Sequence, residues 1–474
     1  MKNFFGTTAV CVGAFLATAD GATRIVPDTY STIQAAVDAA IANDTIQVNP
    51  GTYTERVSVA KSVKILGSDP ATTIVDADGT GTNFLLTADG ITIAGFTIKN
   101  SYVGLSLSYA DNCLFSNLIV SGITSFGTFS RTAKSNTFAN CVFVSNTSYA
   151  LCLSDTSSSY NTITNCDFHD NYIALQAYAN CSYLRVANST FYNNAQALQL
   201  GWINPWLVEN CGIYSNSGGI SVDTASGGAV RNCEITYNAA DGIGVGGMGS
   251  YLNTFESNNI VGNGRGVNLS VKAQRNTVRA NTIALNGEGV QINRHPSDSY
   301  LNYSNRVYGN DFIGNATNGY VPEDRYTNFF DNGYPAGGNY WDDYTGVDVL
   351  SGPAQDQPGS DGIGDTPIVL SPKCKDTYPL MTCSRSVPPV PPFRSSMCFM
   401  SPSSGRTRTP LAGSSSPGRS ICPTTGPGPI SGSRSECVMA SAANRHPGWR
   451  EGKTSLSATF ARCALRLGIQ EEQE

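Results

Sequence analysis

The feature that most constrains the fold is an internal repeat. An aromatic residue or Ile is followed three residues later by Asn, then by a small residue and alternating apolar residues. Successive Asn positions differ by 25, 23, 22, 22, 25, 23 and 29 residues. A near-constant period of this size is typical of solenoids. The repeats are Phe143…Asn146, Phe168…Asn171, Phe191…Asn194, Ile213…Asn216, Ile235…Asn238, Ile260…Asn263, Ile283…Asn286 and Phe312…Asn315.

The segments after each Asn, such as 150–153 and 266–269, have the alternation of short strands. A leucine-rich repeat has a similar period but needs a helix or 3₁₀ segment on its convex side, and these segments are too short and β-rich for that. The sequence therefore predicts an all-β fold, a right-handed parallel β-helix whose coils stack about 4.7–4.9 Å apart.

Identical residues at one coil position are expected to stack into ladders. Stacked Asn amides donate to one neighbour and accept from the next, and Asn also tolerates the left-handed turn between strands. Cysteines occupy a second position, two residues before the repeat's Phe or Ile, where we expect small buried hydrophobes in poor disulfide geometry. This position holds Cys113, Cys141, Cys166, Ser189, Cys211 and Cys233.

The N-terminus predicts export and a cap for the solenoid. Residues 1–19 combine one early charge, an apolar run and a small-x-small ending, as signal peptides do. The run is too short to span a membrane. Ser31 and Gln34 have capping-box spacing, and Ile33, Val37, Ala40 and Ile41 form one apolar helical face. We expect a short N-terminal capping helix and a secreted, cell-surface or periplasmic protein without a membrane span.

Charge and composition change near the C-terminus. Residues 1–384 hold 19 Lys+Arg and 31 Asp+Glu, so nucleic acid is not expected as a partner. After Ser384 the repeat is absent, and Ser, Pro, Gly and Arg dominate. Residues 384–474 are interpreted as a disordered tail or as a stretch translated out of frame, and both interpretations stay open.

Two stretches carry a family resemblance. The run from Thr32 to Glu55, with Pro50-Gly51-Thr52-Tyr53, resembles the start of pectinesterases and other pectin-lyase-like β-helix proteins. Segments 337–346, 360–367 and 375–380 resemble the end of the NosD-like β-helix domain of archaeal surface and periplasmic proteins. The resemblance covers residues 24–383 and implies a β-helix over 24–336 with a closing segment over 337–383.

The closing segment offers candidate metal ligands. Asp361 and Asp365 flank glycines in an acidic turn, and Asp356 lies nearby. Calcium takes six to eight oxygen ligands, often from such loops. The alternative, in which the carboxylates cap backbone N–H groups of a turn, stays open. Cys374 and Cys383 flank the last motif and could form a disulfide in an oxidising compartment.

Catalytic signatures are missing from the coils. Glycoside hydrolysis uses two carboxylates that face one sugar, and no acids occupy matched positions on adjacent coils between 141 and 320. Glu209 and Arg231 form one matched charge pair. The motifs of pectinesterases and polygalacturonases are absent, and His169 and His295 are interpreted as loop residues. The NosD resemblance implies copper handling, but the sequence lacks the clustered Met, His or Cys residues that copper sites use.

Aromatic residues favour sugar binding. Tyr183 and Trp206 each lie fifteen residues after the Phe of their coil and are expected on one face, near Tyr178 and Trp202. We expect an exported surface protein that binds carbohydrate or cell-envelope partners without catalysis. Two alternatives remain: a polysaccharide-active lyase or hydrolase of the pectin-lyase-like class, and an accessory factor in periplasmic copper-enzyme maturation.

Overall fold

A computed structural model of the protein describes residues 21–154, 157–293, 302–322 and 327–385. The expected signal peptide, His295 and residues 386–474 lie outside the described residues. None of the described helices is long and apolar enough to cross a membrane.

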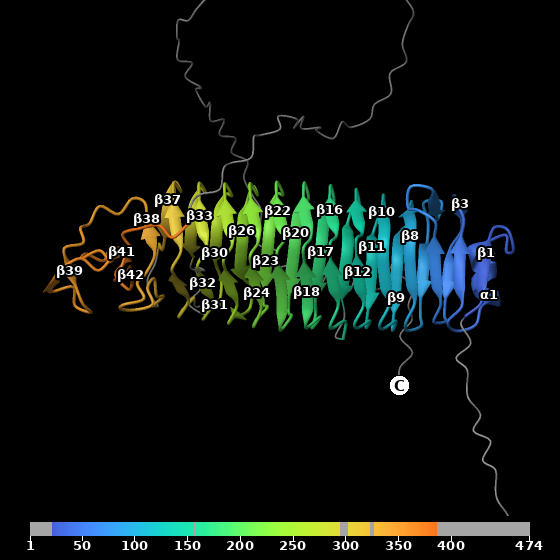
Figure 1. The fold of residues 1–474 in the computed structure, drawn as a ribbon, viewed down its shortest axis with the longest axis horizontal. Helices are drawn as coiled ribbons and strands as arrows, with labels where there is room; N and C mark the ends of the chain where they lie inside the picture. The colour runs from blue at the N-terminus through green and yellow to red at the C-terminus, as the bar shows by residue number, and fades with distance from the viewer. Residues whose placement is uncertain (1–20, 155–156, 294–301, 323–326, 386–474) are drawn as a thin grey trace, which may run out of the picture. The chain divides into compact units, whose positions relative to one another are not determined.

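The described chain winds into a parallel β-solenoid of short stacked strands (Figure 1). The prediction of an all-β parallel β-helix is confirmed. Each coil contributes one strand to a 12-stranded sheet, here called sheet B. Its strands are β4 (Val57–Val59), β7 (Thr82–Leu86), β9 (Val103–Ser108), β11 (Phe126–Arg131), β14 (Tyr149–Ser154), β17 (Ile173–Tyr178), β20 (Gln196–Gly201), β23 (Gly218–Asp223), β26 (Asp241–Gly246), β30 (Arg265–Leu269), β34 (Glu288–Ile292) and β37 (Thr317–Tyr320).

The rest of each coil forms two strand rows separated by a short bend, which is two residues long in most coils. The first row is β1 (Thr23–Val26), β2 (Thr45–Val48), β5 (Lys64–Gly67), β12 (Thr137–Ala139), β15 (Thr162–Thr164), β18 (Leu184–Ala187), β21 (Trp206–Glu209), β24 (Ala229–Arg231), β28 (Thr254–Glu256), β32 (Thr277–Arg279) and β35 (Arg306–Tyr308). The second row is β3 (Gly51–Thr54), β6 (Thr73–Asp76), β13 (Val142–Val144), β16 (Asp167–His169), β19 (Thr190–Tyr192), β22 (Gly212–Tyr214), β25 (Glu234–Thr236), β29 (Asn259–Val261), β33 (Thr282–Ala284), β36 (Asp311–Ile313) and β38 (Tyr340–Trp341). Strands β8 (Thr92–Lys99) and β10 (Leu114–Ser121) run through both rows.

The Asn ladder forms as predicted. Asn171 donates from Nδ2 to Oδ1 of Asn194 (3.0 Å) and to the Phe143 carbonyl (2.9 Å), and its Oδ1 accepts from Asn146. The left-handed bend falls one residue earlier than expected, on Asp170 (φ 57°) and its equivalents. The ladder Asn therefore fills the corner inside the bend, where its amide pairs backbone groups that the turn leaves unsatisfied.

The Cys position is a ladder of its own. Cys113, Cys141, Cys166, Cys211 and Cys233 are buried, as predicted. Cys141 Sγ lies 3.4 Å from the Ala139 carbonyl, and Ser189, in the same position, donates to Ala187 O at 2.8 Å. Ser can replace Cys here because the side chain at this position must be small and must donate a hydrogen bond to the carbonyl of the residue two positions earlier in the sequence. From Asn258 onward Asn takes this position, as the bond from the Cys233 N–H to Asn258 Oδ1 (2.9 Å) shows.

From residue 161 to 315, coil length varies mainly at one turn. The second-row corner follows the first-row corner by five residues in each coil from 161 to 315, and the ladder Asn follows after five more. The remaining arc, which contains sheet B and the turn after it, spans 15 residues from Asn146 to Asn161 but 12 from Asn194 to Trp206. Insertions therefore accumulate at the turn that follows sheet B.

The N-terminal cap is α1 (Ile33–Ala39), which buries Ile33, Ala36 and Val37. The predicted capping box is wrong: Thr32 is the N-cap, and its Oγ1 accepts from the Ala35 N–H at 3.0 Å. Glu55, from β3's edge, accepts from the N–H groups of Ile33 and Gln34 at 2.9 Å each. A carboxylate at a helix start complements the exposed N–H groups and the helix dipole. Ile41, expected on the apolar face, is 69% exposed because the helix ends before it.

The other end of the core is closed by Trp341, whose ring stacks on Phe312 at 4.4 Å. Asp376 is fully buried and accepts from Trp341 Nε1 (2.8 Å) and the Asn339 N–H (2.7 Å). Burial raises the pKa of Asp376 to about 7 although these donors oppose the shift.

The remaining strands form short two-stranded pairs. In the closing segment β39 (Leu350–Ser351) pairs with β40 (Gln357–Pro358), and β41 (Ile368–Ser371) pairs with β42 (Cys374–Asp376). In the turn after sheet B, β27 (Ser250–Tyr251) pairs with β31 (Ala273–Gln274).

Candidate functional site

Tyr183 lies in the turn after sheet B and is 53% exposed. Its ring stacks on Tyr160 of the preceding coil, with centroids 4.4 Å apart and planes at 5°. Tyr160 is 55% exposed. Both residues have left-handed backbone torsions, so the turn projects their side chains away from the core. The ring beside Tyr183 is thus Tyr160, where the sequence indicated Trp206.

Trp206 lies elsewhere than predicted. In the register of β18 and β21, Trp206 pairs with Leu184, so Tyr183 lies opposite Pro205. The turn before β21 is one residue shorter than the turn before β18, and a shift of one residue moves a side chain to the other face of the strand. Trp206 is accordingly 3% exposed. A Cβ on Gly228 of the next coil would approach within 1.9 Å of its indole, so this glycine leaves the space for the ring.

Tyr178 and Trp202 do lie together. The Tyr178 ring covers Gly201 of the next coil, where a Cβ would come within 2.5 Å of it, and Trp202 follows directly, 45% exposed. The Asn180 N–H donates to the Trp202 carbonyl at 2.7 Å, which ties the two turns together. Burial, and then the charge of Asp223, raises the pKa of Tyr178. We call Tyr160, Tyr178, Tyr183 and Trp202 the aromatic turn surface.

The aspartates of the closing segment bind backbone groups of their own turns. Asp365 accepts from the N–H groups of Val349 (3.1 Å) and Leu350 (3.1 Å), and Asp361 accepts from Gly352 (3.2 Å). Asp356 is exposed. These contacts fit the alternative interpretation, in which the carboxylates cap N–H groups. Cys374 is buried and Cys383 is exposed, and no disulfide joins them.

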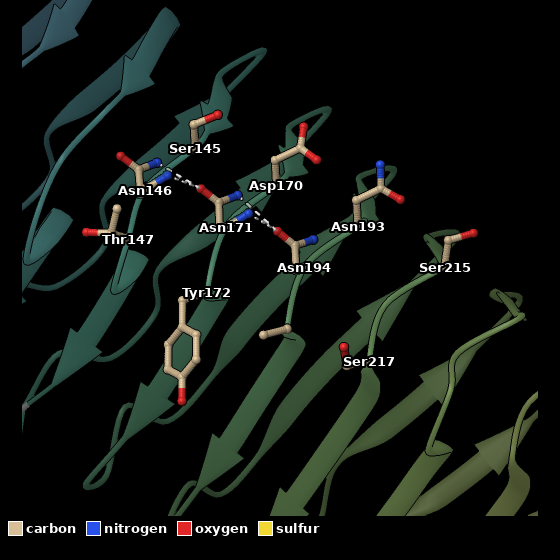
Figure 2. Close-up of a pocket in the computed structure, with 11 residues that line it drawn as sticks. Ser145, Asn146, Thr147, Asp170, Asn171, Tyr172, Asn193, Asn194, Ser215 and Ser217 are labelled. Carbon is tan, nitrogen blue, oxygen red and sulfur yellow. Dashed lines mark hydrogen bonds between the residues drawn. The ribbon is translucent and has the colours of Figure 1, made fainter. Parts of the chain in front are cut away.

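A pocket lies at the opposite end of the sheet B strands, along the Asn corner (Figure 2). It is an open hollow of about 570 Å³. Its floor is the Asn ladder, and hydroxyl, amide and carboxylate side chains from four consecutive coils surround it. The lining residues include Ser145, Thr147, Asp170, Tyr172, Asn193, Ser215 and Ser217. Such a lining can exchange hydrogen bonds with a ligand rich in hydroxyl groups.

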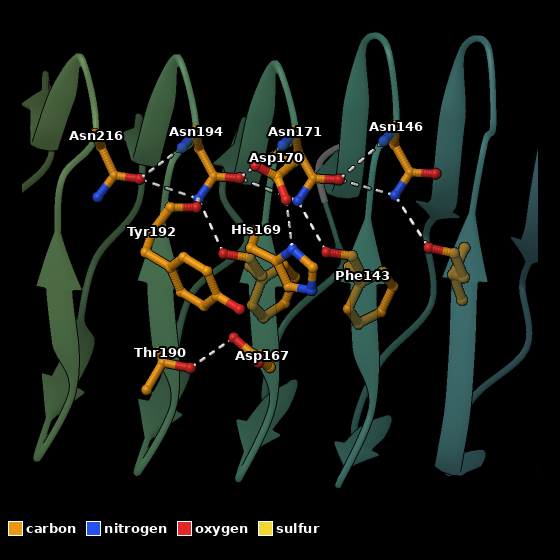
Figure 3. A network of polar contacts seen from close by, with 12 residues as sticks. Phe143, Asn146, Asp167, His169, Asp170, Asn171, Thr190, Tyr192, Asn194 and Asn216 are labelled. Atoms are coloured by element: carbon orange, nitrogen blue, oxygen red, sulfur yellow. Dashed lines mark hydrogen bonds and ion pairs between the residues drawn. The ribbon is translucent and has the colours of Figure 1, made fainter. Parts of the chain in front are cut away.

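Beside this hollow, the outer side of β16, β19 and β22 carries a titratable cluster (Figure 3). His169 Nδ1 lies 2.7 Å from Asp170 Oδ2, and the imidazole stacks on Tyr192 at 4.9 Å. Tyr192 stacks in turn on Tyr214 at 5.3 Å. Thr190 Oγ1 donates to Asp167 Oδ1 at 2.7 Å. Burial, and then the charge of Asp167, raises the pKa of Tyr192. A histidine oriented by a carboxylate beside a phenol is equipped for proton transfer.

Sequence reasoning missed this cluster. His169 was interpreted as a loop residue, whereas it lies on β16 with its side chain 21% exposed. The available signal was positional: the residues that follow Phe168, Phe191 and Ile213 are His169, Tyr192 and Tyr214, which the register pairs in adjacent coils. Glu209 likewise binds two cations, Arg231 at 2.8 Å and Arg185 at 2.6 Å, where the sequence indicated only the first. The Arg231 hydrogen bond is the main cause of the lowered pKa of Glu209.

The described residues do not suit a bound metal. No group of three or more His, Cys, Asp or Glu side chains that could hold a metal ion occurs within residues 21–154, 157–293, 302–322 and 327–385. The ladder thiols are buried and directed at backbone carbonyls. Cu(I) prefers sulfur or imidazole ligands, and the sulfur atoms that the described residues bring together, Cys141 with Cys166 and Cys211 with Cys233, are those of buried ladder thiols.

Comparison with known proteins agrees with the fold. Residues 180–346 match the family described as Periplasmic copper-binding protein (NosD), and residues 82–201 match the Right handed beta helix region. A comparison with curated proteins gave no significant match.

Among solved structures, the A-module of mannuronan C-5 epimerase AlgE6 from Azotobacter vinelandii is similar over 62% of this chain and 92% of its own, with TM-score 0.54 and 19% identity. The AlgE4 A-module from the same organism is similar over 66% of this chain and 98% of its own, with TM-score 0.53 and 15% identity. At these identities the likeness concerns the fold. The solenoid and its ladders establish the β-helix fold, and the family matches show that residues 180–346 are similar to NosD proteins and residues 82–201 to right-handed β-helix proteins.

Proposed function

We propose that the protein is exported and binds polysaccharide on its coil surface, with the aromatic turn surface as a principal contact. The observation that carries the proposal is the pair of parallel rings of Tyr160 and Tyr183, exposed on adjacent coils. Exposed aromatic rings offer apolar faces with polar edges, which suit the faces and hydroxyl groups of a sugar ring. Tyr178 begins the turn that holds Tyr183, and Trp202 extends the surface by one coil. Trp206 supports this surface from the core and is not itself proposed as a contact.

Export is part of the proposal. The matched NosD family is described as periplasmic, and residues 1–19 have the pattern of a signal peptide. A solenoid with sugar-binding side chains on several coils can bind an extended polymer outside the cytoplasm, either free or within the cell envelope.

The binding experiment uses the full-length chain and a glycan array that includes acidic, neutral and amino polysaccharides. We expect binding to at least one polymer, and a loss of at least tenfold in affinity when Tyr183 and Trp202 are both replaced by Ala. Tyr251→Ala is the matched control, because Tyr251 is also exposed (44%) but lies outside the surface. Unchanged binding by the double variant would refute the assignment of this surface.

A second candidate function, an enzyme acting on polysaccharide, is favoured by the cluster around His169. The Asp170 carboxylate would orient the imidazole as a base, and Tyr192 would serve as the partner acid. Incubation with the polymers that bind, followed by assays for reducing ends and for unsaturated products, tests this candidate. Turnover that disappears in His169→Ala, with binding retained, would establish an enzyme; no turnover on any bound polymer would leave binding as the function.

A further inference from the structure

The coils between residues 141 and 293 have few cations available to a ligand. They contain six Lys and Arg against nine Asp and Glu. Four of the six cations are held by carboxylates of the protein: Arg185 and Arg231 by Glu209, Arg265 by Asp241 and Arg279 by Glu256. The other two, Lys272 and Arg275, lie in the turn that follows β30. An acidic polymer would therefore meet carboxylates without compensating cations on the outer side of sheet B.

One carboxylate on sheet B lacks a partner. Asp241, Arg265 and Glu288 occupy the same position on three successive strands, β26, β30 and β34. Arg265 forms its ion pair with Asp241, and its Nη1 donates to Gln291 Oε1 at 3.4 Å. The Glu288 side chain makes no hydrogen bond or ion pair with any described residue, and its Oε2 is buried. A shielded carboxylate oxygen without a donor is costly, and its usual partners are cations or strong donors.

A second acceptor without a hydrogen-bond donor lies on the adjacent strand. Asn268 follows Arg265 on β30, faces away from the core and is 7% exposed. Its Nδ2 donates to Asp241 Oδ2 at 2.9 Å, which fixes the orientation of the amide and leaves Oδ1 without a partner. The neighbouring position on β26 is Gly244, where a side chain would come within 2.8 Å of the Asp241 carboxylate. Gly244 therefore leaves room for the Asp241 carboxylate that holds the Asn268 amide, and two unpaired acceptors lie on adjacent coils.

We infer that the outer side of β26, β30 and β34 is a subsite for an amino sugar of a non-acidic polysaccharide. The ammonium group of the sugar would pair with Glu288, and a sugar hydroxyl would donate to Asn268 Oδ1. The negative charge of a uronic acid excludes its binding here, because Arg265 is already paired with Asp241 and the unpaired groups are hydrogen-bond acceptors. This inference rests on the proposed function, polysaccharide binding, and specifies the class of polymer.

The experiment measures binding of three oligosaccharides to the full chain by calorimetry: de-N-acetylated glucosamine oligomers, their N-acetylated counterparts and oligomannuronate. We expect the de-N-acetylated oligomer to bind at least tenfold more tightly than either of the others. Glu288→Gln should reduce that affinity at least tenfold and remove the preference over the N-acetylated form. Asn268→Ala should weaken both forms alike. Glu234→Gln, an exposed carboxylate on another side of the coils, is the matched control and should change nothing.

The outcomes separate this inference from the proposed function. If Glu288→Gln binds like the parent chain while the Tyr183 and Trp202 replacements abolish binding, the subsite is refuted and polysaccharide binding stands. Tighter binding of oligomannuronate would also refute the subsite. If no glycan of the array binds the parent chain, both proposals fall. Melting curves of each variant check that a loss of binding does not come from unfolding.

Discussion

The Asn ladder allows a quantitative test with a single substitution, Asn194→Ala. Asn194 Oδ1 accepts from the Asn171 N–H at 2.9 Å, and its Nδ2 donates to the Phe168 carbonyl at 2.9 Å. Asn194 is 2% exposed, so water cannot readily replace the lost side chain. Two backbone groups would be left unpaired in the interior, at about 1–3 kcal/mol each. We therefore expect the free energy of unfolding to fall by about 2–6 kcal/mol.

The matched control for this substitution is Asn193→Gly. Asn193 precedes Asn194, is exposed and has φ of 55°, a conformation that glycine adopts without strain. We expect a change within about 0.5 kcal/mol, as for most surface substitutions. Urea unfolding of both variants, followed by far-UV circular dichroism, gives the comparison. If Asn194→Ala costs no more than the control, the ladder does not stabilise the coils in the way described here.

Three further predictions concern other parts of the molecule. Burial raises the pKa of Asp376 from 3.8 to about 7, so the contribution of this group to the free energy of unfolding is complete at pH values below 3.8 and is lost as pH rises through 7. Trp341 fluorescence during unfolding should therefore report a less stable closing segment at pH 8 than at pH 5.5. The substitution Asp376→Asn should remove this difference. Gly228→Ala should displace the Trp206 indole and cost about 1–3 kcal/mol, measured by thermal melting; an unchanged melting temperature would show that the ring moves freely. The melting temperature should be the same with calcium and with chelator, because the carboxylates of the 356–365 loop already accept hydrogen bonds from backbone N–H groups. A higher melting temperature with calcium would support a metal site in this loop.

The repeat predicted the fold because its residues contact the equivalent residues of the adjacent coils. The positions of Asn146 to Asn315 define one corner of every coil, and the hydrogen bonds between them follow from stacking alone. A second corner, marked by the Cys ladder, was predicted only as far as Cys233, and a third corner was missed, since the residues at both change identity along the stack. One passes from Cys233 to Asn258, and the other passes from Trp206 through Gly228 to Asn253.

The candidate sites were predicted less well, because they depend on the turn where coil length varies. Counting from Phe168 and Phe191 placed Tyr183 and Trp206 in register, but the intervening turns differ by one residue. The His169 cluster follows a corner of constant length and was predictable in principle. It was missed because His169 was evaluated alone, without Tyr192 and Tyr214 on the neighbouring coils.

The concentration of length changes at the turn after sheet B has a consequence for how such a molecule diversifies. From residue 161 to 315 the two five-residue arcs serve as a fixed spine, because an insertion there would shift the ladder residues out of register with the adjacent coils. The length of the turn after sheet B is not restricted in this way, and it already differs by several residues between coils. New surface loops can therefore be added or exchanged along this single edge, one coil at a time, while the stack beneath remains unchanged. Tyr160, Tyr183 and Trp202 all lie on that edge, so ligand preference can change there without a change in fold.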